Sequence, residues 1–168
     1  MKNLIAVFAA IVLVAGLTAT ANAQVTGTAT GSATIITPIA ITNAGNMNFG
    51  SIAVSATAGT VVLSPASVRS ITGGVTLPAV TGTVTAAAFT VTGLGSSTYS
   101  IQLPASYTIT SGGNSMTVNA FTSTPSGTGT LSSGTQTIQV GATLNVAASQ
   151  AAGSYTNATG FPVIVNYN

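Results

Sequence analysis

Side chains that could carry out acid–base or metal chemistry are almost absent from this sequence. Its 168 residues include no Asp, Glu, His or Cys, and the only ionised side chains are Lys2 and Arg69. General acid–base catalysis needs a group that exchanges protons near neutral pH, and a serine nucleophile needs a base. Transition metals need imidazole, thiolate or carboxylate ligands, and calcium sites need carboxylates. We therefore predict that the chain is not an enzyme and holds no metal or other cofactor.

The same low charge argues against a nucleic-acid partner, because displacing counterions from phosphates takes several cations. A structural or adhesive role, exerted through the backbone and the shape of the molecule, is what remains. Arg69 is expected to be a solvated residue at a sheet edge, where a charge opposes aggregation. The four tyrosines are expected in the core or at sandwich corners with hydrogen-bonded hydroxyls, and they are Tyr99, Tyr107, Tyr155 and Tyr167.

Residues 1–23 have the pattern of a secretory signal peptide. A short positive head precedes an apolar run from Leu4 to Leu17, and "ANA" at 21–23 is a small-residue cleavage site. The apolar run is too short to span a bilayer comfortably, and no longer one follows. We expect a secreted protein that passes through the periplasm to the cell surface, begins at Gln24 and has no transmembrane helix.

The rest of the chain reads as all-β. It is 46 % hydrophobic, which argues against disorder, and it is rich in Thr, Val and Ile, which favour strands. Strand candidates separated by Gly, Pro and Asn turns indicate a β-sandwich or a closed sheet. They are residues 25–36, 39–42, 47–54, 60–64, 67–72, 82–93, 97–103, 107–110, 115–122, 135–148 and 160–168.

Both ends of the predicted mature chain alternate in the period of a strand with one buried face. At the start, residues 24–38 form an extension, and the positions that alternate with Thr or Ser are Val25, Gly27, Ala29, Gly31, Ala33 and Ile35. At the end, one face carries Phe161, Val163, Val165 and Tyr167. An open strand edge invites pairing, and this chain lacks the charges that usually prevent it. The partner of the first strand lies either in the same chain or in a neighbouring one.

The closing stretch "GSYTNATGFPVIVNYN" resembles the chaperone–usher pilins of Gram-negative bacteria. Those subunits end in an alternating strand with a penultimate Tyr, here Tyr167, and a Gly about fourteen positions earlier, here Gly153. They also begin with an unpaired alternating extension. The sequence is similar, too, to an uncharacterised family of secreted pilin-like domains, through "MNFGSI" and the last third of the chain.

The pilin resemblance implies an immunoglobulin-like β-sandwich of Greek-key character over 39–168 that lacks one strand. It makes 24–38 the candidate donor strand. The candidate acceptor-groove strand then carries Gly153, Phe161, Val163, Val165 and Tyr167. It also implies homologous subunits as partners, with a periplasmic chaperone and an outer-membrane usher.

Two functions follow as hypotheses. In the first, the chain is a structural subunit of a pilus-like surface fibre, or fimbrium, joined by β-strand addition. In the second, it is a monomeric secreted or surface-attached β-sandwich that binds a ligand or belongs to a matrix. The two differ in whether residues 25–36 pair between chains or within one.

Overall fold

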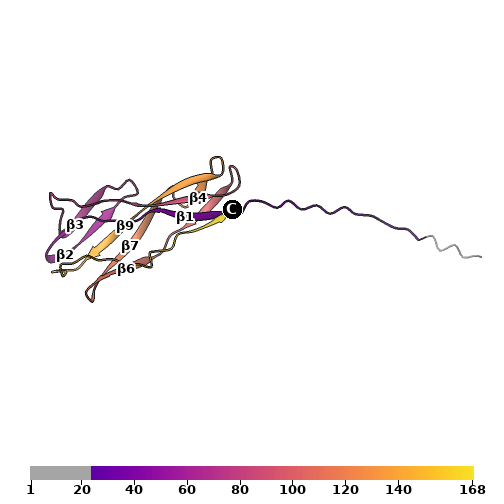
Figure 1. Ribbon diagram of the computed structural model, residues 1–168. Coiled ribbons are helices and arrows are strands. Elements are labelled where there is room, and N and C mark those ends of the chain that lie inside the picture. Colours follow the sequence, from indigo (N-terminus) through magenta and orange to yellow (C-terminus); the bar gives the residue numbers. More distant parts are fainter. Residues whose placement is uncertain (1–23) are drawn as a thin grey trace, which may run out of the picture. The chain divides into compact units, whose positions relative to one another are not determined.

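The computed structural model describes residues 24–168, and every regular element among these residues is a β-strand (Figure 1). The predicted signal peptide at 1–23 lies outside the described residues. The strands are β1 (Ala40–Gly45), β2 (Ala53–Leu63), β3 (Arg69–Thr76), β4 (Ala87–Thr92), β5 (Thr98–Gln102), β6 (Ser106–Ser111), β7 (Asn114–Thr124), β8 (Thr128–Thr130), β9 (Thr135–Val146) and β10 (Ile164–Tyr167). No helix in this described part is long and apolar enough to cross a membrane.

The strands form two antiparallel sheets, which confirms the predicted all-β sandwich. In the larger sheet the order is β1-β4-β9-β2-β3, and β7 pairs with β9 and with β6. The smaller sheet has the order β10-β5-β8. Neighbouring strands in both sheets are often far apart in sequence, which is the Greek-key character expected from the resemblance.

The long strand β9 organises the larger sheet. Its residues Thr135–Val140 pair with β4, whereas Ala142–Val146 pair with β2. Gly141 lies where one neighbour replaces the other, and a Cβ there would overlap the carbonyl oxygen of Leu63. The absence of a side chain at Gly141 thus makes room for β4 and β2 to pair with successive parts of β9.

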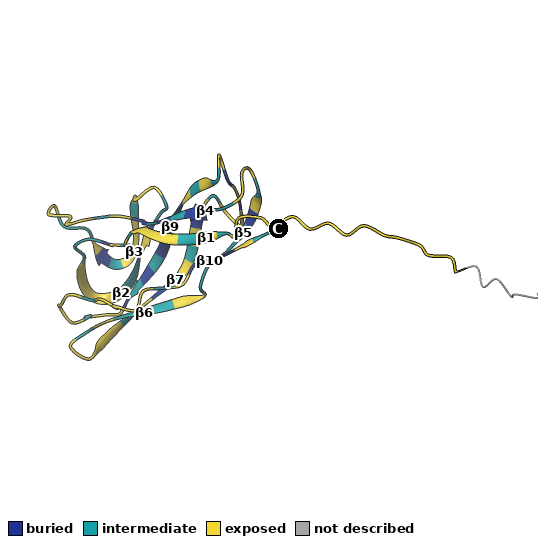
Figure 2. Ribbon diagram, turned by 45° about the vertical axis from the view of Figure 1, so that its right-hand side comes forward, coloured by how far each residue is buried: buried dark blue, intermediate teal, exposed yellow. Residues whose placement is uncertain are grey.

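Two apolar clusters form the core. The first lies where β4 and β9 meet the smaller sheet, and its fully buried side chains include Val91, Tyr99 and Ile138. The second lies under β2, β7 and the end of β9, with Val61, Leu63 and Leu144. Buried positions on β4 and β9 appear as dark segments in Figure 2.

Several of the predicted strands need correction. Residues 47–54 were expected to be one strand, but only Asn48 makes a bridge, to Thr85, before β2 begins at Ala53. The strand expected over 82–93 is reduced to β4, and β8 was missed. The turn predicted at 111–114 is confirmed, because Gly112 and Gly113 have φ of 53° and 85° between β6 and β7.

Residues 35–168 form one compact unit, and the described residues before it, 24–34, are not part of that unit. The expected first strand, 25–36, is not a strand here: residues 24–39 belong to no strand or bridge, and 24–38 are exposed. Their apolar side chains include Val25, 91 % exposed, and Ile35, 97 % exposed. Although the sequence of this segment alternates like a strand, the segment pairs with no strand of the described chain.

Candidate strand-acceptor edges

β10 is an edge strand with a free outer side. It pairs with β5 in a register that joins Val165 to Ile101 and Asn166 to Ser100. The N–H of Asn168, just after β10, donates to the carbonyl of Thr98 at 3.3 Å. Because hydrogen-bonded pairs alternate along an antiparallel ladder, the backbone groups of the even-numbered residues of β10 are the ones that bond to β5. The N–H and C=O groups of Val165 and Tyr167 therefore point away from β5. Within residues 24–168 these outward backbone groups have no hydrogen-bond partner.

β1 is the corresponding edge of the larger sheet. The N–H of Gly93 donates to Gly134, so odd-numbered residues of β4 face β9 and even-numbered ones face β1. Because Ile41 pairs with Val91, the backbone of Ile41 points to the free side. β1 and β10 approach each other without forming a ladder. Two open edges from different sheets thus lie on one flank of the sandwich.

The edge of β6, by contrast, is covered by the segment that connects β9 to β10. Thr156 forms a two-way backbone bridge with Thr110, with N···O distances of 2.9 and 3.0 Å. The side-chain amide of Asn157 donates to the carbonyl of Thr108 at 2.8 Å. The amide of Asn157 therefore takes the place of a neighbouring strand at this position.

The edge of β8 is also covered, by a side chain. Oε1 of Gln136 accepts a hydrogen bond from the N–H of Thr130 at 2.9 Å, and a second from the hydroxyl of Tyr99 at 2.6 Å. With only three residues, β8 offers little backbone to another strand.

β3 has an open outer edge that is short and interrupted. Ser64 donates its N–H to Val68, so the backbone of Ile71 points outward. Gly73, with φ of 66°, leaves the extended conformation only two residues later. The conformational break and the inward-pointing Arg69 both hinder addition of a strand.

Arg69 is not the solvated edge residue expected from the sequence. It is half-buried, and its Nη1 donates to the carbonyl oxygens of Phe49 at 2.7 Å and Ser51 at 2.9 Å. The guanidinium therefore holds the segment between β1 and β2 against β3. A single Arg in a neutral chain could not reveal this contact, because Phe49 lies twenty positions away in the sequence.

The side chains under the β10 edge are already enclosed. Val163 is 8 % and Val165 is 9 % exposed, and both belong to the first core cluster. Phe161 is half-buried, with its ring centroid 4.9 Å from that of Phe121 and 6.1 Å from that of Phe89. The resemblance implied a sandwich open for lack of a strand. The structure instead has an open backbone edge over a closed core.

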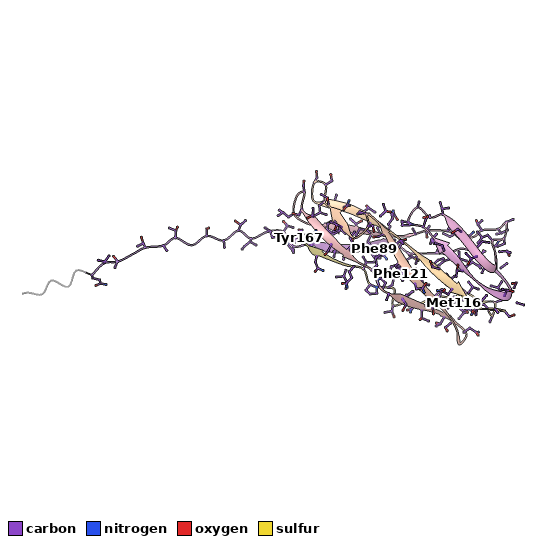
Figure 3. All side chains as sticks on the ribbon, turned by 180° about the vertical axis from the view of Figure 1, so that it is seen from behind. Phe89, Met116, Phe121 and Tyr167 are labelled. Atoms are coloured by element: carbon purple, nitrogen blue, oxygen red, sulfur yellow. The ribbon has the colours of Figure 1, made fainter. Side chains whose placement is uncertain are left out.

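Gly153 and Tyr167 occupy different places. Gly153 is exposed in the loop before β10, and a Cβ there would overlap Oγ of Ser111 at the β6–β7 turn. Tyr167 is at the end of β10, and Figure 3 shows it near one end of the sandwich, with Met116 toward the other and Phe89 and Phe121 between. The structure joins Phe161, Val163 and Val165 in one core, while Gly153 lies apart from them.

The hydroxyl of Tyr167 links three distant parts of the chain. It donates to the carbonyl of Thr37 at 2.9 Å and accepts from the N–H of Leu94 at 2.6 Å. A Cβ on Gly93 would overlap this hydroxyl. The other three tyrosine hydroxyls also donate hydrogen bonds, to Gln136, Asn157 and Ala151, as expected.

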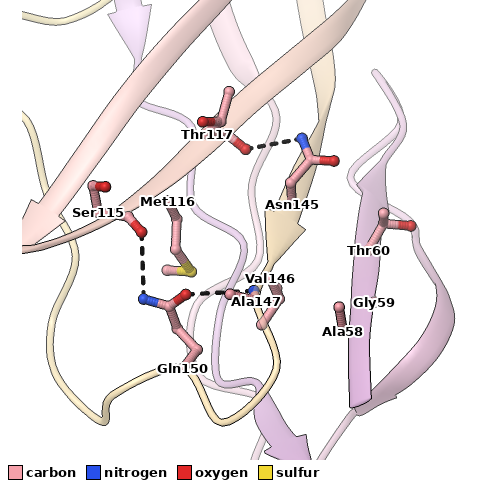
Figure 4. Close-up of a pocket in the computed structure, with 10 residues that line it drawn as sticks. All are labelled: Ala58, Gly59, Thr60, Ser115, Met116, Thr117, Asn145, Val146, Ala147 and Gln150. Carbon is pink, nitrogen blue, oxygen red and sulfur yellow. Dashed lines mark hydrogen bonds between the residues drawn. The ribbon is translucent and has the colours of Figure 1, made fainter.

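A hollow of about 490 Å³ lies at the other end of the larger sheet, between β2, β7 and β9 (Figure 4). Nδ2 of Asn145 donates to Thr117 and Asn119, and Nε2 of Gln150 donates to Ser115 and Tyr155. Both amides are therefore engaged within the protein. No cluster of metal-ligating side chains occurs among the described residues.

Two tyrosine side chains have pKa values that their surroundings raise. Burial raises the pKa of Tyr99 above its usual range. Burial also raises the pKa of Tyr107, against a smaller lowering from a hydrogen bond with the backbone of Gly160. Both tyrosines are neutral at physiological pH, so they add packing and hydrogen bonds but no charge.

Comparison with protein families matches residues 39–167 to a domain of unknown function, DUF4402. The chain belongs to this family. The match to the DUF4402 domain begins one residue before β1 and ends with β10, so it spans both open edges. Searches of curated proteins and of solved structures found no match.

Proposed function

We propose that this DUF4402 protein is a secreted structural subunit that assembles into a pilus-like surface fibre by β-strand addition between copies. The observation that carries the proposal is the outer edge of β10. Its backbone groups at Val165 and Tyr167 lack partners within residues 24–168, whereas β6 and β8 are covered by their own chain. Strand addition to such an edge is a common mode of recognition.

The donor in this proposal is residues 24–38 of a second copy. The segment is exposed, in no strand, and alternates apolar or small residues with Thr or Ser up to Thr34. Gly27 and Gly31 have no side chain to bury, and a methyl group adds only about 0.8 kcal/mol. Because the core under β10 is closed, main-chain hydrogen bonds would supply most of the affinity. A periplasmic chaperone that temporarily pairs with β10, and an outer-membrane usher, would suit this route.

Proline substitution tests the proposed edge directly. Val165→Pro removes an N–H that points to the free side of β10 and leaves the bonds to β5 in place. We expect the full mature chain to remain folded and to stop polymerising. Ile71→Pro is the matched control, since it removes an outward N–H from the interrupted edge of β3, and this variant should still polymerise.

Negative-stain microscopy and gels run with and without boiling would report the polymer, and thermal unfolding would report the fold. As a second variant, deletion of residues 24–36 should give folded subunits that do not polymerise. Polymers of normal length from both Val165→Pro and the deletion variant would refute strand addition at β10.

A monomeric binding or matrix module is the second candidate. The closed core favours it, because Val163 and Val165 are buried without a strand from another molecule. This alternative predicts a folded monomer in light scattering at all accessible concentrations, with residues 24–38 present.

A further inference from the structure

Tyr167 takes part in two features of the molecule at once. Its backbone belongs to the outward side of the β10 edge, opposite Tyr99 of β5. Its hydroxyl donates a hydrogen bond to the carbonyl of Thr37, close to the C-terminal end of the donor segment 24–38. One residue therefore connects the edge proposed to accept a strand with the base of the segment proposed to be donated.

Two neighbouring residues hold the Tyr167 hydroxyl in place for its contact with Thr37. The same hydroxyl accepts a 2.6 Å hydrogen bond from Leu94, and Gly93 is the residue that lets the phenol approach. Thr37 is separated from Ala40, the first residue of β1, by two residues. The phenol thus fixes the chain just before it enters the larger sheet.

We infer that Tyr167 is a positioning residue that couples the acceptor edge of a subunit to its own donor segment, an inference that rests on the proposed function. β10 has one neighbouring strand, so its backbone retains freedom that a second neighbour would remove. A strand added to the N–H and C=O of Tyr167 holds the phenol against Thr37. Ordering of residues 36–39 then lowers the entropy cost of presenting the preceding part of the donor segment to the next copy. Growth of the fibre becomes cooperative as a result.

Hydrogen–deuterium exchange of the full mature chain tests the coupling. The chain is kept dilute and monomeric, and a synthetic peptide of residues 24–36 is added in excess. In the unmodified protein, the peptide should slow exchange in β10 and also in residues 36–41. In Tyr167→Phe, which keeps the ring and loses the hydroxyl, it should still slow exchange in β10 but leave residues 36–41 unchanged.

Tyr155→Phe is the matched control, because its hydroxyl bonds Ala151 and Gln150, away from both features. It should behave as the unmodified protein does. Seeded fibres of Tyr167→Phe should elongate about five-fold more slowly or worse, the lower range of allosteric coupling. Equal protection of residues 36–41 in Tyr167→Phe and the unmodified protein would overturn the coupling alone. Lack of protection of β10 in every variant would overturn strand addition and the coupling with it.

Discussion

At the scale of residues, hydroxyls and amides replace the missing charges. The side chain of Gln136 hydrogen-bonds to both Tyr99 and Thr130, that of Asn157 to Thr108, and that of Tyr167 to Thr37 and Leu94. No buried side-chain N or O atom in the described part of the chain lacks a hydrogen-bond partner. In a chain without carboxylates, neutral side chains have taken over the contacts that ion pairs often make.

Gly93→Ala tests how closely Tyr167 is packed. The added Cβ would overlap the Tyr167 hydroxyl and come within 3.0 Å of Leu131. We expect a loss of about 1–3 kcal/mol in the free energy of unfolding, the usual cost of overpacking. Gly45→Ala is the control, since its Cβ would make an ordinary 3.7 Å contact with Ala88. Urea unfolding measures both, and equal midpoints would contradict the packing described here.

At the scale of elements, the strands differ in how their edges end. β6 is closed by the loop that precedes β10, and β8 is closed by Gln136. The open edge of β3 is interrupted at Gly73, whereas the edges of β1 and β10 are open and have no such conformational break. The selective covering leaves one flank available for the proposed strand addition, and a fibre with a single mode of assembly would need such a restriction.

Asn157→Ala tests the covering of β6. The substitution removes the hydrogen bond to Thr108 and the one that Oδ1 accepts from Thr159. Loss of these bonds should cost about 1 kcal/mol in the free energy of unfolding. Relative to the unmodified protein, hydrogen exchange of the β6 amides should become faster, and by more than that of the β7 amides. Asn114→Ala removes only a 3.4 Å hydrogen bond to Ser111 at the β6–β7 turn, and serves as the control. Unchanged exchange in β6 would show that Asn157 does not protect this edge.

At the scale of the whole molecule, the absence of Asp, Glu and His governs the response to pH. Buried Tyr99 and half-buried Tyr107 have raised pKa values, so the folded state retains their protons at a pH where the unfolded chain releases them. The free energy of unfolding should therefore be nearly constant from about pH 4 to 9. It should fall as the pH rises past about 10, the ordinary pKa of tyrosine.

Urea midpoints measured across this range would check the prediction. Tyr107→Phe should reduce the alkaline loss, because one shifted phenol is removed. A cooperative unfolding step between pH 4 and 7 would contradict it, since no side chain of the chain titrates there.

The sequence by itself determined the local features: β-strands, turns such as Gly112-Gly113, the absence of Asp, Glu, His and Cys, and the alternation at both ends. These follow from side-chain period and residue type, which act over a few neighbouring residues. Tertiary structure alone decided which edges are open, why Arg69 is half-buried, and why β8 exists. Each of these depends on partners distant in sequence, such as Phe49 for Arg69 and Tyr99 for Gly129 of β8. The closed core beneath β10 belongs to the same class, because burial of Val163 and Val165 is set by β4, β5 and β9 packing together rather than by the strand that carries them.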